Sequence, residues 1–187
     1  MKTPVTDEEL LIRTGQGRDK QAFEILCDRY AGPIFAMASR MGLAAPDAED
    51  AVQNMLVKLW QKAHLWDKRK GASAKTWIYQ ISYNVIIDVH RRNKGFFGLF
   101  SGGTPTENTV DNKPKEVSLS QKDLVRKGLK DIPERQRSAL ILFYYEGLST
   151  QDIADIQKTT PKAIERLLAR ARKTFKDNLQ RLEVSHV

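Results

Sequence analysis

The stretch STQDIADIQKTTPKAIERLLARARKTFKDNL, residues 149–179, contains the signals for a short helix, a turn and a long basic helix. Ser149 and Asp152 have the spacing of a capping box, in which each side chain bonds the backbone N–H of the other residue at a helix start. Thr160 followed by Pro161 predicts the start of the second helix, because proline is favoured at the first helical position. This order is typical of a helix-turn-helix, although other helical hairpins give a similar pattern.

Two further helices are predicted before this segment. Ser118 or Ser120 can cap a helix that ends near Lys130, and Pro133 can start another that stops at Gly147.

The first half of the chain is also helical in its pattern. Pro46 can open a helix to about residue 64, with carboxylates in its first turn where the helix dipole favours them. Ser73 is the expected cap of the next helix, which has a stripe of apolar side chains from Trp77 to Val89. Residues 19–41 have helical spacing as well, and we expect a break or kink at Pro33.

Residues 95–117, GFFGLFSGGTPTENTVDNKPKEV, separate the two halves and show no sustained helical period. A structureless stretch of this length is uncommon inside a compact domain, so we interpret it as a linker. We therefore expect an all-α fold of two small helical domains, 1–94 and 118–187, joined by a flexible linker, with the helix-turn-helix in the second. Phe96, Phe97 and Phe100 can either cover a neighbouring surface or dock on a partner.

Composition excludes several classes of protein. Of the 187 residues, 41% are hydrophobic and 29% are charged, as in a globular chain rather than a disordered one. The single cysteine, Cys27, allows neither an internal disulfide nor a zinc finger, and its helical position predicts a buried thiol. No run is apolar enough for a membrane span or a signal peptide, so we expect a cytoplasmic protein.

The formal net charge of +8 is concentrated in two places. Residues 68–94 hold seven basic residues and one acidic residue, and residues 162–176 hold six and one. Two basic segments, one in each predicted domain, favour a polyanionic partner over a merely soluble surface.

The basic helix after Thr160 has two faces. Arg166, Arg170 and Lys173 share one face, and the apolar side chains, such as Ile164 and Leu168, point to the other. We expect this helix to contact nucleic acid, with phosphates supplying most of the affinity and the first turn reaching base edges.

The basic segment of the first domain is mixed with aromatic residues, in KRKGASAKTWIYQISY. Stacking faces beside cations suit unpaired bases. Trp77 lies on the apolar stripe and is expected in the core, whereas Tyr79 and Tyr83 lie nearer the polar side and are the better stacking candidates. Arg91 and Arg92 can either contact a ligand or only stabilise the end of the helix dipole.

Over both basic segments and the helices around them, the sequence resembles the extracytoplasmic-function group of sigma factors, in the sigma-70 family of bacterial RNA polymerase. The matching strings are DAEDAVQNMLVKLWQKA, KTWIYQISYNVIIDVHRR, IPERQRSALILFYYEGLSTQDIADI and AIERLLARARKTF. With a weaker match over AFEILCDRYAGPIFAMA, they span most of residues 19–178. Their order, with the linker between them, makes the resemblance specific.

The resemblance implies three binding surfaces. The helix from Pro46 would dock on the coiled coil of the polymerase's largest subunit. The loop and helix after Asp67 would capture a flipped base of the melted minus-ten element. The helix from Thr160 would read the minus-thirty-five element, and its domain would also touch the flap of the second-largest subunit. The implied polymerase contacts are Glu49, Asp50, Gln53, Asn54 and Lys58. The implied minus-ten contacts are Lys68, Arg69, Lys70, Lys75, Tyr79, Tyr83, Asn84, Arg91 and Arg92. The implied minus-thirty-five contacts are Thr160, Pro161, Lys162, Glu165, Arg166, Arg170, Arg172 and Lys173.

The sequence departs from the family pattern in three places. The loop after Asp67 is more basic than the common acidic and aromatic version, Gln157-Lys158 stands where a Leu-Gly turn is frequent, and Lys162-Ala163 replaces a common Gly-Thr. Promoter DNA and core RNA polymerase are the implied partners, and regulation by an anti-sigma factor is a family expectation.

Other functions are less compatible with the residues. The three histidines are scattered and no phosphate loop or nucleophile motif is present, so we expect neither an enzyme nor a metal or cofactor site. A stand-alone helix-turn-helix regulator is the alternative, but its first domain would carry a ligand pocket or a dimer seam rather than a basic and aromatic loop.

Overall fold

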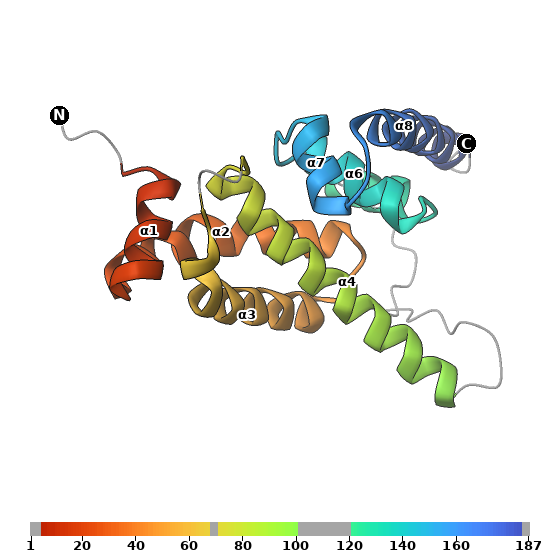
Figure 1. The fold of residues 1–187 in the computed structure, drawn as a ribbon. Helices are drawn as coiled ribbons and strands as arrows, with labels where there is room; N and C mark the ends of the chain where they lie inside the picture. The colour runs from red at the N-terminus through yellow and green to blue at the C-terminus, as the bar shows by residue number, and fades with distance from the viewer. Residues whose placement is uncertain (1–4, 68–70, 101–120, 185–187) are drawn as a thin grey trace.

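The computed structural model describes residues 5–67, 71–100 and 121–184, which form eight α-helices and one 3-10 turn, without a strand (Figure 1). The elements are α1 (Asp7–Gly17), α2 (Lys20–Arg40), α3 (Ala45–Lys62), η1 (Ala63–Leu65), α4 (Ala74–Phe100), α5 (Gln121–Leu129), α6 (Glu134–Tyr144), α7 (Thr150–Gln157) and α8 (Pro161–Val184). The prediction of an all-α fold is confirmed. We call α1–α4 the first unit and α5–α8 the second unit. None of the described helices is long and apolar enough to cross a membrane.

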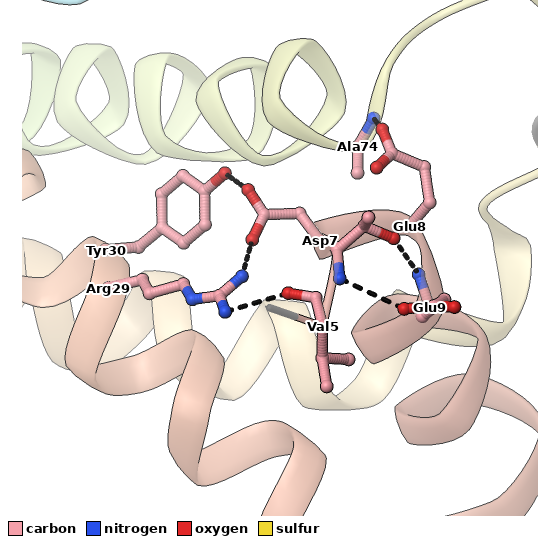
Figure 2. A network of polar contacts seen from close by, with 8 residues as sticks. Val5, Asp7, Glu8, Glu9, Arg29, Tyr30 and Ala74 are labelled. Atoms are coloured by element: carbon pink, nitrogen blue, oxygen red, sulfur yellow. Dashed lines mark hydrogen bonds and ion pairs between the residues drawn. The ribbon is translucent and has the colours of Figure 1, made fainter. Parts of the chain in front are cut away.

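The first helix is tied to the rest of the first unit by a polar network at its start (Figure 2). Asp7 accepts hydrogen bonds from the Tyr30 hydroxyl and, at 2.6 Å, from the Arg29 guanidinium, both on α2. Burial and the bond to Asp7 raise the pKa of Tyr30. The neighbouring Glu8 carboxylate accepts a bond from the backbone N–H of Ala74 at 3.2 Å, so α1 also holds the first turn of α4.

Helices α2, α3 and α4 pack around an apolar core that includes Leu26, Ile34, Met55 and Ile86. The helix is not broken at Pro33, since α2 runs from Lys20 to Arg40 with this proline inside it. Its partly buried Cys27 lies on a helix as expected, although the thiol is not fully buried.

The fourth helix begins as predicted but ends later. The Ser73 hydroxyl accepts a bond from the Thr76 backbone N–H at 3.0 Å, which confirms the cap. The helix then continues to Phe100, so residues 95–100 are helical, contrary to our expectation of a linker from Gly95. Two glycines in this stretch weaken a helix without preventing it. The rest of the predicted linker, with the side chains of Phe96, Phe97 and Phe100, lies outside what the structure describes.

In the second unit, α8 packs against α5, α6 and α7. The buried Asn178 on α8 donates a 2.9 Å hydrogen bond to the Gly128 carbonyl of α5. The buried Gln157 amide donates to the Arg135 carbonyl and to the Ser138 hydroxyl of α6 at 3.1 and 2.9 Å. Gln157 thus joins α7 to α6 by hydrogen bonds. The leucine that is frequent at this position in the family could make only apolar contacts.

The helix-turn-helix forms from α7 and α8 with the predicted caps. The Ser149 hydroxyl accepts from the Asp152 backbone N–H at 3.1 Å, and the Asp152 carboxylate accepts from the Ser149 N–H at 3.0 Å. Thr160 caps α8 through a 3.2 Å bond from the Ala163 N–H. Between the helices Lys158 has the left-handed backbone, φ 51°, that glycine adopts most easily.

The two units lie against each other along α4 (Figure 1). α3 packs on one side of α4, and α7 packs on the other side, against the first half of the helix. At the edge of this contact the Arg40 guanidinium of α2 stacks on the Tyr145 ring of the second unit, 4.0 Å from its centroid. α4 is therefore covered from two directions.

Candidate nucleic-acid interface

The exposed side of α3 carries the residues implied to bind the polymerase. Four of them are exposed and Lys58 is half-buried, with its ammonium 3.9 Å from the Asp88 carboxylate of α4. Val57, which our sequence reading missed, is 54% exposed on the same helix. An exposed apolar side chain among polar ones is the composition expected of a protein contact. The exposed set on this face is Glu49, Asp50, Gln53, Asn54 and Val57.

The residues implied to bind the minus-ten element are divided by the structure. Lys68, Arg69 and Lys70 lie outside the described part of the chain. The exposed members on α4 are Asn84, Arg91 and Arg92.

The two tyrosines and the tryptophan on α4 have environments opposite to those expected. Tyr79 and Tyr83 are 2% and 9% exposed, whereas Trp77 is only partly buried. The expectation that both rings are accessible was wrong, because the second unit covers their side of α4. Tyr79 contacts the Tyr30 ring edge to face, and Tyr83 interacts with Ser138 of α6. In this arrangement Trp77 is the more accessible ring.

Lys75 and its neighbours on α4 face the second unit through hydrogen bonds. The Lys75 ammonium donates to the Glu146 carbonyl at 2.5 Å, and the Tyr79 hydroxyl donates to the Glu146 carboxylate. The Thr76 hydroxyl donates to the Asp152 carboxylate at 2.6 Å. Burial and the bond to Glu146 raise the pKa of Tyr79 above its ordinary value.

The basic face of α8 is exposed as predicted, and its apolar face is buried. Ile164, Leu168 and Ala171 pack inward against the second unit. Thr160 and Pro161 begin the helix at its exposed end. The exposed polar set is Lys162, Glu165, Arg166, Arg170, Arg172 and Lys173.

A hollow of about 260 Å³ lies beside this face, between α8, the turn before it and the start of α6. Arg166 and Arg170 line it together with Arg135, which our sequence reading did not select. Arg135 is held in place by a 3.0 Å bond from its guanidinium to the Gln157 carbonyl. Three guanidinium groups around one hollow suit an anion such as a nucleic-acid phosphate. Arg135 lies 31 residues from Arg166, so helical spacing could not have connected the two.

The described residues contain no cluster of three or more His, Cys, Asp or Glu side chains that could hold a metal ion. The exposed polar groups on the basic face of α8 are mostly cations, which suit the phosphates of a nucleic acid.

Comparisons with known proteins agree with this geometry. Residues 26–96 match the family model for sigma-70 region 2, and residues 122–175 match that for sigma-70 region 4. The chain is 28% identical to the ECF RNA polymerase sigma-E factor of Haemophilus influenzae, over 97% of this chain and all of that protein.

Two solved structures have a similar arrangement of helices. The sigma factor RpoE, in a co-crystal structure with the anti-sigma factor NepR from Bartonella quintana, has a TM-score of 0.67 and 27% identity, over 86% of this chain and 96% of that one. CnrH, in complex with the cytosolic domain of CnrY, has a TM-score of 0.69 over 93% of this chain and 97% of that one, and at 20% identity supports the fold alone. Matches to both sigma regions, in the predicted order, show that the chain belongs to the extracytoplasmic-function group of the sigma-70 family, alternative sigma factors that direct promoter-specific transcription.

Proposed function

We propose that the exposed side of α3 binds the coiled coil of the largest subunit of core RNA polymerase. The support is the set of exposed polar side chains Glu49, Asp50, Gln53 and Asn54, with the exposed Val57 and the half-buried Lys58 beside them. Of the three acidic residues expected in the first turn, only Asp47 lies there, because α3 begins at Ala45. Glu49 and Asp50 lie in the second turn, where the helix dipole has little effect, and their carboxylates face outward.

The loop after Asp67 and the exposed part of α4 bind the minus-ten element as an unpaired strand. The support is the mixture of cations and aromatic rings, which suits phosphates and unstacked bases together. Trp77, partly exposed, joins the proposed stacking residues. Lys68, Arg69, Lys70, Asn84, Arg91 and Arg92 stay in the proposed set, and Lys75, Tyr79 and Tyr83 belong to it only when the second unit moves off α4.

The first turn of α8 reads the minus-thirty-five element in the major groove. The observation that carries this proposal is the exposure of Lys162, Glu165 and Arg166 at the start of a helix whose opposite face is buried. Helix-turn-helix proteins read base edges with this part of the second helix. The arginines around the hollow, including Arg135, hold the adjacent phosphates.

The exposed aromatic end of α6 is the proposed contact with the flap of the second-largest subunit. Phe143 and Tyr144 are 36% and 54% exposed, and their rings pack edge to face. Neighbouring exposed aromatic rings are enriched at protein interfaces.

An anti-sigma factor is a further proposed partner, because RpoE from Bartonella quintana was solved with one. Both core polymerase and promoter DNA are in the bacterial cytoplasm, and we place the protein there.

In vitro transcription with core polymerase tests the proposed function. DNA selected from a random pool by the reconstituted holoenzyme supplies the promoter. We expect initiation at selected promoters only when this chain is added. Tight operator binding by the isolated protein, without added initiation, would instead favour a stand-alone helix-turn-helix regulator.

A further inference from the structure

We propose that one face of α4 binds two partners that exclude each other: an unpaired DNA strand and the second unit of the same chain. The face consists of Lys75, Thr76, Tyr79 and Gln80, and we call it the donor face. This inference rests on the proposed assignment of α4 to the minus-ten element.

The donor face presents hydrogen-bond donors to the second unit, and the second unit supplies acceptors. Lys75 and Tyr79 both donate to Glu146, one to its carbonyl and the other to its carboxylate. Thr76 donates to the Asp152 carboxylate at 2.6 Å, and the Gln80 amide donates to the Asp155 carbonyl at 3.4 Å. An ammonium, two hydroxyls and an amide therefore meet two carboxylates and two carbonyls.

The central contact, between Tyr79 and Glu146, is buried, the Lys75 and Thr76 bonds are partly buried, and the Gln80 bond at the edge is exposed. Thr76 and Tyr79 are each 2% exposed, and Glu146 is 9% exposed. A carboxylate buried at this level is stable only when hydrogen bonds replace its water, and the donor face supplies them. The Tyr79 phenol is protonated at neutral pH, as any tyrosine is, so its hydroxyl can donate to the Glu146 carboxylate.

The same donors are suited to a single strand of DNA. Phosphate oxygens are anionic acceptors like carboxylates, and base edges offer carbonyl acceptors. Nucleic acid can reach Lys75 and Thr76 only after Glu146 and Asp152 have left. Closure by the second unit therefore reduces the apparent DNA affinity of the free chain to the intrinsic affinity multiplied by the fraction of molecules that are open.

The experiment compares two charge reversals in the full-length free chain. Glu146→Lys replaces the central acceptor of the contact with a cation facing Lys75. Asp131→Lys makes the same change in net charge at an exposed residue in the turn before α6. Small-angle X-ray scattering measures the radius of gyration, and fluorescence anisotropy measures binding to labelled single-stranded DNA of random sequence.

We expect Glu146→Lys to increase the radius of gyration and to tighten DNA binding about tenfold relative to Asp131→Lys. Adding Lys75→Ala to Glu146→Lys should remove most of that gain, whereas adding Lys20→Ala, an exposed lysine at the start of α2, should not. Glu146→Gln keeps the shape of the side chain and should shift both measurements in the same direction by less.

Two results would overturn the inference. One is an unchanged radius of gyration in both Glu146 variants, and the other is an expanded molecule whose affinity equals that of Asp131→Lys. Transcription by the wild-type holoenzyme is scored separately. Its absence refutes the proposed function, whereas its presence with unresponsive free-chain variants refutes only the exclusion between the second unit and DNA.

Discussion

Gly15 sets the distance between α1 and the backbone that follows α3. A Cβ atom at this position would lie 2.7 Å from the carbonyl carbon and oxygen of Ala63 and from the His64 nitrogen. Backbone atoms cannot move aside as the end of a flexible side chain can. The close approach therefore depends on a residue without a side chain.

Gly15→Ala is expected to lower the free energy of unfolding by about 1–3 kcal/mol, because the helices must separate to admit a methyl group. Gly17→Ala is the matched control: it lies on the same helix, and a Cβ there meets nothing within 4 Å. The control should be neutral or stabilising by up to about 1 kcal/mol, as for alanine in other helices. Urea unfolding of both variants measures the difference, and equal stabilities would show that α1 adjusts freely.

Tyr79 and Trp77 show what could not be predicted at this scale. The apolar stripe on the helix after Ser73 predicts one buried face, and the tyrosines lie off that stripe. α4 has a second buried face because α7 packs on it, and no local pattern reveals which helix arrives from 70 residues away. Lys158 is similar, since its positive φ is set by the helix-turn-helix rather than by a preference of lysine.

The first turn of α7 makes hydrogen bonds both within the second unit and to the first unit. Its Asp152 carboxylate completes the capping box with Ser149 and also accepts the bond from Thr76 of α4. Burial raises the pKa of Asp152, but the hydrogen bonds from Ser149 and Thr76 outweigh burial and hold the pKa below its ordinary value.

This lowered pKa predicts a pH dependence. A carboxyl group whose pKa is lower when folded adds stability above its unfolded pKa and loses that contribution as the pH falls through the folded pKa. Asp152→Ala should lower the free energy of unfolding by about 1 kcal/mol at pH 7. The difference from the wild type should shrink as the pH falls below about 4. Urea unfolding across pH 3–7 checks it, and a constant difference would contradict the role of the ionised carboxylate.

The start and the middle of α8 are expected to differ in how they recognise DNA. Arg166→Ala should weaken holoenzyme binding by about 1–3 kcal/mol for the preferred upstream element and by less for other sequences. Arg172→Ala removes an exposed cation farther along the helix and should weaken all sequences alike. Anisotropy with a panel of upstream sequences measures both. If Arg166→Ala weakened binding to every upstream sequence equally, as Arg172→Ala is expected to do, Arg166 would not be a residue that reads bases.

Helix starts were predictable because their signals are local. Ser73, Ser149 and Thr160 each cap a helix through a bond within three residues, so neighbouring letters carry the information. The end of α4 was not predictable in this way. Glycines at 95 and 98 resemble a linker, and the helix nevertheless continues to Phe100.

Across the whole molecule, the candidate surfaces for polymerase, the minus-ten element and the minus-thirty-five element lie on α3, α4 and α8, and α4 lies between α3 and the second unit (Figure 1). The order of the motifs allowed us to predict two helical units and the exposed faces of α3 and α8. The contact between the units could not be predicted, because its hydrogen bonds join residues 67–76 positions apart whose separate patterns fit an exposed surface equally well.

Polymerase binding tests the arrangement of the surfaces in the intact chain. Asp50→Arg should weaken binding to core polymerase at least tenfold, as reversing a charge in a complementary interface does. Glu24→Arg makes the same reversal on an exposed part of α2 and serves as the control. Competition for core polymerase measures both variants. An unchanged affinity for Asp50→Arg would remove Asp50 from the proposed polymerase contact.

All the tryptophans of the chain, Trp60, Trp66 and Trp77, belong to the first unit. Trp60 packs on Phe23 beneath the Arg18 guanidinium, Trp66 donates a bond to the Ala72 carbonyl, and Trp77 is partly exposed. Tryptophan fluorescence therefore reports on the first unit alone, and it needs no added label. Trp60 and Trp77 are both partly exposed, and Trp77 lies on α4, so acrylamide quenching of the indoles gives an optical signal for a ligand that binds beside the candidate minus-ten surface.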